Sequence, residues 1–215
     1  MHSDYDTDPG RWKSIDRSTH LAGDVHSLVA RLIIDEGLTP VVDVGGGEGE
    51  LVRHLPEGSP AAVIDLSSTM LAAAPHPKVQ ARAERLPIAD GSAGAVTMLW
   101  MLYHLHQPEL AVHEARRVLS DGGLFAASTS ARTNDPELTD GYPPTTFDAE
   151  DAEHIVTRVF DDVIVQRWDD KLTLLRDADA VARYCVSHSL PPSAARRVKP
   201  PVLLTKRGCL VLARR

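Results

Sequence analysis

The chain has 215 residues, of which 43% are hydrophobic and 25% are charged, and its formal net charge is -7. This size predicts a single domain over residues 1–215. The acidic balance disfavours a polyanion as the general partner, and no apolar run approaches the ~20 residues of a membrane helix, so neither nucleic acid nor a membrane is the expected partner.

The cysteine content indicates a reducing compartment. Cys185 and Cys209 lie far apart in the sequence, and the chain starts without a signal-like segment. This argues against a disulfide scaffold, so we expect two small core residues in a cytoplasmic protein. The sequence leaves the oligomeric state open, a homodimer included.

The N-terminal segment 1–20 is polar but contains Tyr5 and Trp12. Two interpretations are open for these aromatic residues: they bind the substrate and close the site as a lid, or the terminus is disordered. Apolar residues then recur at helical spacing from Leu21 to Gly37, which predicts an amphipathic helix.

The run VVDVGGGEGE at 41–50 follows this helix. Its consecutive valines predict a buried parallel strand. Gly45, Gly47 and Gly49 predict a strand-to-helix turn in which a ligand can lie against the main chain. The dinucleotide fingerprint would need glycine where Glu50 stands, and no phosphate loop follows, so the acidic turn favours a cationic ligand. A plain glycine turn without a ligand is the alternative.

Strands and helices then alternate. We expect strands at 61–66, 79–83, 95–102 and 124–128, a short helix capped by Ser67 or Ser68, and a helix that begins at Pro108 and ends at Asp121-Gly122-Gly123. This order predicts an α/β fold with a doubly wound parallel sheet that binds ligands beyond the carboxyl ends of its strands.

The last third changes character. Residues 131–147 read as a long loop, followed by a helix at 148–159 and a strand at 163–168. Asp169-Asp170 predicts a turn toward residues 172–175, and 178–187 predicts a helix. The terminal VLLTKRGCLVLARR predicts a hairpin-like or bulged strand around Lys206-Arg207-Gly208. We expect 131–147 and 176–200 to be insertions that shape the acceptor side.

Asp65 ends the second strand, 16 residues after Gly49. In a doubly wound sheet such an acid lies beside the glycine turn and can accept hydrogen bonds from a ribose. The alternative is that Asp65 caps the helix that follows.

Several motifs in combination resemble the class I S-adenosylmethionine-dependent methyltransferases, in particular the small-molecule group of the ubiquinone/menaquinone-biosynthesis type. They are DVGGGEG, the spaced Asp65, AERLPIADGS, the YHL after the fourth strand, and HEARRVLSDGGLF. The resemblance covers about residues 38–130. It implies S-adenosylmethionine as cofactor and a Rossmann-like, mostly parallel seven-stranded sheet with an antiparallel C-terminal strand or hairpin.

The resemblance also implies roles for single residues. Asp43 and the loop Gly45, Gly46, Gly47 and Gly49 would lie against the methionine part of the cofactor. Asp65 would hold the ribose, Leu66 would pack on the adenine, and the Ala83 N–H would meet the adenine edge. Leu99 and Trp100 would border the methyl donor.

Two positions depart from the family pattern. Arg82 stands where an acid commonly accepts a hydrogen bond from the adenine amino group, and arginine cannot accept one. Gly94 stands where an Asp usually precedes the fourth strand. Either Ala83 and apolar packing hold the adenine, with Glu84 replacing the acid, or cofactor affinity is weakened.

Methyl transfer requires little acid-base chemistry, because alignment in a dry site lowers the barrier. A base helps only a hydroxyl or a protonated amine. His104 is the best candidate base and Tyr103 lies beside it, on the catalytic and acceptor side; a structural histidine is the alternative.

The expected function is therefore methyl transfer to O or N of a small organic acceptor, such as a specialised metabolite. RNA methylation through the basic tail after Asp179, or a cofactor-binding protein that has lost catalysis, are the alternatives. The ten histidines are dispersed, so we expect no metal site, and no G-x-S-x-G motif supports a serine hydrolase.

Overall fold

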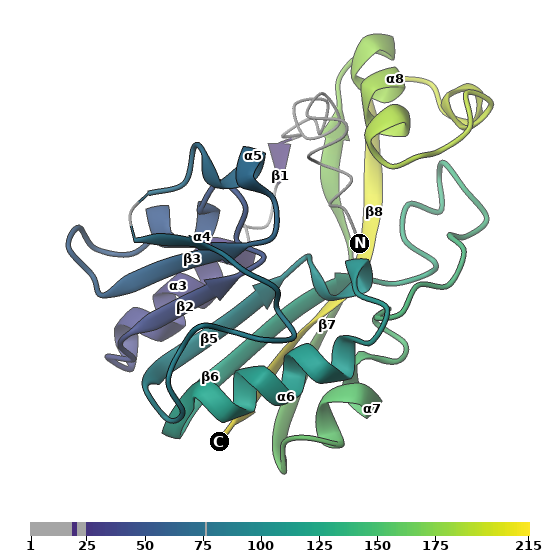
Figure 1. The fold of residues 1–215 in the computed structure, drawn as a ribbon. Coiled ribbons are helices and arrows are strands. Elements are labelled where there is room, and N and C mark those ends of the chain that lie inside the picture. The colour runs from purple at the N-terminus through teal and green to yellow at the C-terminus, as the bar shows by residue number, and fades with distance from the viewer. Residues whose placement is uncertain (1–18, 21–24, 76) are drawn as a thin grey trace.

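The computed structural model describes residues 19–20, 25–75 and 77–215, and these form an eight-stranded sheet (Figure 1). The strand order is β1-β7-β8-β6-β5-β2-β3-β4. The strands are β1 (Thr19–His20), β2 (Val41–Val44), β3 (Ala61–Asp65), β4 (Lys78–Gln80), β5 (Ala93–Leu99), β6 (Leu119–Ser130), β7 (Asp162–Leu175) and β8 (Val202–Arg214). Strands β2 to β6 run parallel, whereas β8 is antiparallel to β6 and β7. The expected seven-stranded, mostly parallel sheet is confirmed, and the two-residue β1 adds an edge strand to it.

Helices cover both faces of the sheet, as a doubly wound fold requires. On one face, which we call the α3 face, α3 (Val25–Asp35) and α4 (Glu50–Arg53) pack against Val41 of β2. On the other, the α6 face, α6 (Pro108–Val118) and α7 (Ala152–Thr157) share a core with Val42 and Val44. Both faces of the parallel strands are therefore buried, which explains their continuous apolar sequences.

Strands β7 and β8 continue past the end of β6. Pairing between β6 and β8 stops at Ser130 and Gly208, but β7 and β8 remain paired from Asp169 and Arg207 to Leu175 and Val202. We call residues 169–207 the arm. It carries α8 (Ala178–Ser187) and the short 3-10 helix η2 (Ala194–Arg197), which share a separate apolar core. Because β8 is antiparallel to β6, the arm projects from the carboxyl ends of the parallel strands (Figure 1).

One predicted turn in this region is wrong. Asp169-Asp170 does not turn the chain, because β7 runs through it. Of the two forms expected around Lys206-Arg207-Gly208, a strand or a hairpin, the structure has the strand: these residues lie inside the antiparallel strand β8. The two polar pairs lie opposite each other in the antiparallel ladder, and Arg207 Nε donates to Asp169 Oδ1 at 2.9 Å. Cross-strand charge pairing therefore replaces the turns that each pair suggests locally.

A third boundary also differs from the prediction. Helix α6 ends at Val118, and β6 begins at Leu119, so Gly122 and Gly123 lie in the strand instead of ending the helix. The N–H of Gly122, whose φ is 77°, donates to the carbonyl of Arg215 at 3.0 Å. These glycines bend the first part of β6 next to the C-terminal residue.

The cysteines are as predicted: Cys185 and Cys209 are free thiols in the core, with exposed fractions of 3% and 0%. Burial raises the pKa of Cys209 to about 11, which suits a structural rather than a reactive thiol. Within the described ranges, no helix has the length and apolar character to cross a membrane. The same residues contain no cluster of three or more side chains suited to a metal ion.

Candidate functional site

The glycine loop after β2 is built around left-handed backbone conformations. Gly45, Gly47 and Gly49 have φ values of 67°, 53° and 81°, which non-glycine residues rarely adopt. A Cβ on Gly45 would lie 2.6 Å from Cγ of Met101, so the chain that leaves β5 packs directly on this loop. The Gly45 N–H donates to the carbonyl of Ile64 at 2.6 Å, which ties the loop to β3. The sequence predicted this turn, and its glycines are required by both backbone and packing.

Asp65 lies beside the loop, as expected. Its Oδ2 accepts a hydrogen bond from the Gly47 N–H at 2.9 Å, and its Oδ1 accepts one from the Ser67 N–H at 2.8 Å. The half-buried carboxylate therefore connects the end of β3 to the middle of the glycine loop. Asp65 is not the N-cap of α5 (Ser68–Leu71), because Ser67 caps that helix by accepting from the Met70 N–H. The capping alternative for Asp65 is thus wrong.

Asp43 lies under the same loop. Its Oδ1 accepts from the hydroxyl of Thr97 at 2.7 Å, and a Cβ on Gly46 would fall 2.3 Å from its Oδ2. The side chain is almost fully buried, with 3% of the residue exposed. Burial raises the pKa of Asp43 to about 6, although the Thr97 hydrogen bond lowers it. A cation bound nearby would offset this desolvation.

The residues expected at the adenine follow β3 and β4. Leu66 is half-buried, and its carbonyl accepts from Gln80 Nε2 at 2.9 Å. Ala83 is buried, and among the described residues its N–H has no hydrogen-bond acceptor. Arg82 is exposed, and its Nη2 donates to Glu84 Oε1 at 3.0 Å. The departure at Arg82 therefore neutralises Glu84, the residue expected to replace the missing acid.

The other departure from the family pattern, Gly94, lies at the opposite end of the sheet from the glycine loop. It is the second residue of β5, and a Cβ on it would lie 2.5 Å from the backbone nitrogen of Thr39. Leu99 ends the same strand about 16 Å away, at about 3.3 Å per residue. The prediction that Gly94 precedes the strand is therefore wrong, and its small size serves packing. Its effect on cofactor affinity stays a prediction.

Leu99 and Trp100 come from the carboxyl end of β5. Leu99 is buried, whereas Trp100 is half-buried and has φ = 57°, an outlier for a bulky residue. Asp43 pairs with Thr97 in the sheet, so Leu99 is level with the start of the glycine loop one strand away. The structure thus brings the end of β5 beside the loop. The role of Leu99 and Trp100 at the methyl donor stays a prediction.

Tyr103 and His104 belong to the 3-10 helix η1 (Leu102–His104), one turn beyond Trp100. Their rings are 4.5 Å apart between centroids, and both residues are half-buried. Thr146 of the 131–147 loop donates to the carbonyl of Leu105 at 2.6 Å, which holds this loop next to η1. The catalytic role of His104 and Tyr103 stays a prediction. Tyr5 and Trp12 lie outside the described residues.

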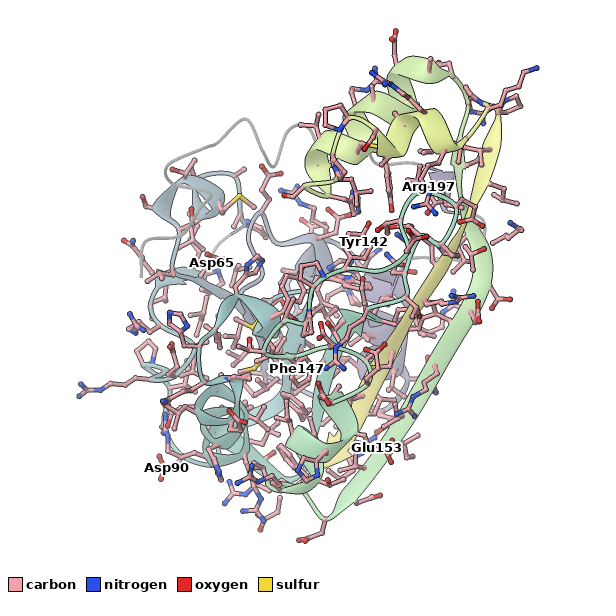
Figure 2. All side chains as sticks on the ribbon, turned by 90° about the vertical axis from the view of Figure 1, so that its right-hand side faces the viewer. Asp65, Asp90, Tyr142, Phe147, Glu153 and Arg197 are labelled. Atoms are coloured by element: carbon pink, nitrogen blue, oxygen red, sulfur yellow. The ribbon has the colours of Figure 1, made fainter. Side chains whose placement is uncertain are left out.

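Figure 2 shows the arm and, of the candidate site residues, labels Asp65. Tyr142 and Arg197 lie at the base of the arm, and Asp90 lies toward the opposite end of the sheet.

The sequence did not point to three residues near the site: Thr97, Met101 and Trp168. Thr97 could have been found, because a lone hydroxyl in an apolar strand needs a buried partner. Met101 and Trp168 gave no local signal, since their neighbours come from distant parts of the chain.

Comparison with known proteins agrees with this geometry. A family model described as "Methyltransferase domain" matches residues 42–127, from β2 through β6. Residues 42–127 are therefore similar to a methyltransferase domain, and we refer to them below by that name. The glycine loop, Asp65 and the end of β5 all lie inside this methyltransferase domain, whereas the arm lies outside the matched residues.

The relatives are distant and partial. A ubiquinone/menaquinone biosynthesis C-methyltransferase UbiE of Methylobacterium nodulans is 31% identical over 121 residues, covering 50% of this chain and 48% of the relative. A malonyl-[acyl-carrier protein] O-methyltransferase of Geobacter sulfurreducens is 35% identical over 115 residues, covering 47% and 43%. The chain thus spans about half the length of these relatives. Because the matched segments cover only about half of each chain, sequence identity to these relatives does not identify the acceptor of this protein.

Solved structures resemble a larger part of the chain. The [4+2]-cyclase SpnF covers 99% of this chain and 95% of its own, with a TM-score of 0.65 and 14% identity. A SAM-dependent methyltransferase from Archaeoglobus fulgidus covers 88% and 94%, with a TM-score of 0.60 and 15% identity. These likenesses show that the fold extends beyond the methyltransferase domain into the C-terminal strands.

Proposed function

We propose that the protein transfers a methyl group from S-adenosylmethionine to O or N of a small organic acceptor by in-line displacement. The observation that carries this proposal is the Asp65 carboxylate, which accepts the Gly47 N–H inside a glycine loop of the methyltransferase domain. An acid in this position, one strand from the loop, is suited to a ribose. The buried Asp43 adds a second carboxyl below the same loop.

The residues present fit such a cofactor. Side chains at Gly46 and Gly47 are excluded, because a Cβ on Gly46 would collide with Asp43 and one on Gly47 would lie 2.9 Å from Met70. The main chain at these two glycines therefore carries no side chain, so a ligand bound there would lie directly against the backbone. When bound, S-adenosylmethionine supplies a methyl group on a sulfonium. The acidic groups around the loop match its positive charge.

Each residue has a distinct task in this proposal. Asp43 and the glycine loop hold the amino acid end, and Asp65 accepts the ribose hydroxyls. The free N–H of Ala83 donates to the adenine edge, with Leu66 packed on its face. Leu99 and Trp100 exclude water at the end of β5, where the transfer takes place. The loop 131–147 and the segment 176–200 shape the acceptor side.

His104 is proposed as the base for a hydroxyl or ammonium acceptor, with Tyr103 beside it. The 3-10 helix places both residues one turn past Trp100, on the chain that packs on the glycine loop. An imidazole can accept a proton near neutral pH, whereas a phenol orients the acceptor by hydrogen bonding. An acceptor that is already nucleophilic needs neither residue.

The basic tail does not favour RNA as the acceptor. Among the described residues, at least five of its eight cationic side chains form ion pairs with acids: Arg197 with Asp140, Lys206 with Asp135, Arg207 with Asp169, Arg214 with Glu36 and Arg215 with Asp121. Charges paired in this way are less available for phosphates. A small molecule therefore remains the proposed acceptor.

The test is methyl transfer from radiolabelled S-adenosylmethionine to a low-molecular-mass cell extract. The proposal predicts label in small molecules and none in added RNA, with His104→Gln lowering transfer about 100-fold for an acceptor that needs a base. Label in RNA would contradict it. Cofactor binding without transfer to any extract would instead favour a protein that uses this fold for other chemistry, as the name of the [4+2]-cyclase SpnF indicates for that structural neighbour.

A further inference from the structure

Two tryptophans from distant parts of the chain meet at the carboxyl ends of the strands. Trp100 follows β5 and Trp168 lies in β7, and their ring centroids are 6.0 Å apart at an interplanar angle of 64°. Both pack against the apolar core of the α3 face, and both are half-buried rather than buried. We call them the tryptophan pair. Part of this aromatic surface is therefore open to a ligand.

The backbone at Trp100 is held in an unfavourable conformation to place the indole. Its φ of 57° is rare for any bulky residue, and glycine would adopt it without strain. The Trp100 N–H donates to the carbonyl of Ser128 at 3.1 Å, which fixes this conformation. Such local strain is found most often at functional sites.

Trp168 depends on a missing side chain in the neighbouring strand. Gly208 of β8 pairs with Trp168, and a Cβ on Gly208 would lie 2.5 Å from Cζ2 of the indole. The ring of Trp168 therefore lies across β8, in the space that any other residue would fill. This places the indole toward Trp100, which follows β5; strands β8 and β6 lie between β7 and β5.

A buried hydroxyl lies next to the pair. Ser128 is fully buried, and its Oγ has no hydrogen-bond partner among the described residues. The next residue, Thr129, satisfies its own hydroxyl by donating to the carbonyl of Phe147 at 2.7 Å. An unsatisfied buried hydroxyl is uncommon and calls for a partner.

The pair also borders the glycine loop. Met101, the residue after Trp100, packs on Gly45, and Asp43 pairs with Thr97 three residues before Trp100. One end of the aromatic surface thus lies beside the proposed cofactor site, and the other lies at the base of the arm. A molecule on this surface would be next to the methyl group.

We propose that the tryptophan pair is the wall against which the methyl acceptor stacks, and that the acceptor is a planar aromatic or conjugated molecule. This inference rests on the proposed function. Flat π-systems match the edge-to-face pair, whereas a saturated molecule of the same size gains only apolar contact. Trp168 is then a specificity-determining residue outside the matched methyltransferase domain.

The test uses two matched probes on the full chain saturated with S-adenosylhomocysteine. 2-Naphthol is planar, and decahydro-2-naphthol has the same skeleton and hydroxyl group but is saturated. Calorimetry is expected to show at least tenfold tighter binding of 2-naphthol. Trp168→Leu should reduce this preference to less than threefold, and Trp168→Phe should retain most of it.

Ile164→Ala is the matched control, because Ile164 lies on the same strand with 59% exposed. It should leave the binding of both probes unchanged. Equal affinity for the two probes, or a preference unchanged by Trp168→Leu, would overturn the inference. Measuring S-adenosylhomocysteine affinity in each variant separates the outcomes. If the wild type does not bind S-adenosylhomocysteine, the result counts against the proposed function. If it binds S-adenosylhomocysteine but does not discriminate between the two probes, the result counts against the aromatic acceptor alone.

Discussion

At the scale of single residues, Asp43, a proposed cofactor-binding residue, makes stability depend on pH. Its pKa is about 6 in the folded chain because of burial, against 3.8 in the unfolded chain. The folded state therefore holds its proton more tightly, so the stability of this group is fully present below pH 3.8 and is lost as the pH rises through 6. Two pKa units correspond to at most about 3 kcal/mol.

Asp43→Asn should thus raise the free energy of unfolding by up to about 3 kcal/mol at pH 8 and change it little at pH 4. Asparagine can still accept from Thr97, so the local packing is retained. The same variant should lose affinity for S-adenosylmethionine. Urea unfolding at both pH values checks the first expectation, and a variant less stable than the wild type at pH 8 would contradict it.

Gly46 offers a second test at this scale. Gly46→Ala should destabilise the chain by about 1–3 kcal/mol, because its Cβ would overlap the Asp43 carboxylate. In an Asp43→Ala background the overlap disappears, so the two effects should not add. Thermal or urea unfolding of the two single variants and the double variant measures this coupling. Additive losses would show that Gly46 is constrained by something other than Asp43.

At the scale of elements, a buried polar cluster holds the arm together. Asp135, which is fully buried, accepts hydrogen bonds from Lys206 Nζ at 2.8 Å, from the Tyr142 hydroxyl at 2.8 Å and from the Tyr184 hydroxyl at 3.0 Å. These groups come from the 131–147 loop, α8 and β8. Removing one charge of such a pair leaves the other buried and unpaired.

Lys206→Met should therefore destabilise the chain by about 3–5 kcal/mol, whereas Asp135→Asn combined with Lys206→Met should recover much of this loss. Chemical denaturation of the wild type and both variants gives the comparison. If the double variant is no more stable than Lys206→Met, the loss arises from packing rather than from an uncompensated carboxylate.

His188 makes the arm sensitive to acid. Its ring stacks on Tyr184 with centroids 3.9 Å apart, and burial lowers its pKa to about 4. Because the folded-state pKa lies below the ordinary 6.5, the stability from this group is present above pH 6.5 and is lost as the pH falls through 4. His188→Phe keeps the stacking without the titration. Its stability should fall less than that of the wild type between pH 6.5 and 4, and identical pH profiles would refute this role.

The elements show where sequence patterns suffice. Helix α8 has the predicted bounds, because Asp177 caps it and its apolar spacing is local to the segment. The glycine turn and Ser67 were equally readable. The continuous strand at Asp169-Asp170 was not readable, and the sequence left a hairpin and a strand open at Lys206-Arg207, since these charged pairs meet across two strands. Pairing between segments about 40 residues apart leaves no local periodicity to read.

At the scale of the whole molecule, the β/α alternation predicted the doubly wound sheet and thus the edge that carries the site. It could not predict the arm, which exists only because β7 and β8 pair beyond the sheet. The tryptophan pair has the same origin, as Trp100, Trp168 and Gly208 come from three strands. The proposed cofactor side therefore follows from short motifs, and the proposed acceptor side follows from tertiary contacts.

The central claim is that the glycine loop and Asp65 bind the cofactor. Isothermal titration with S-adenosylhomocysteine tests it most directly, using Asp65→Ala and, as a matched control, Asp121→Ala at an exposed position. Losing charge-assisted hydrogen bonds predicts about 10- to 100-fold weaker binding for Asp65→Ala, with unchanged binding for Asp121→Ala. No detectable binding to the wild type at millimolar ligand, or equal affinity for all three proteins, would contradict the claim.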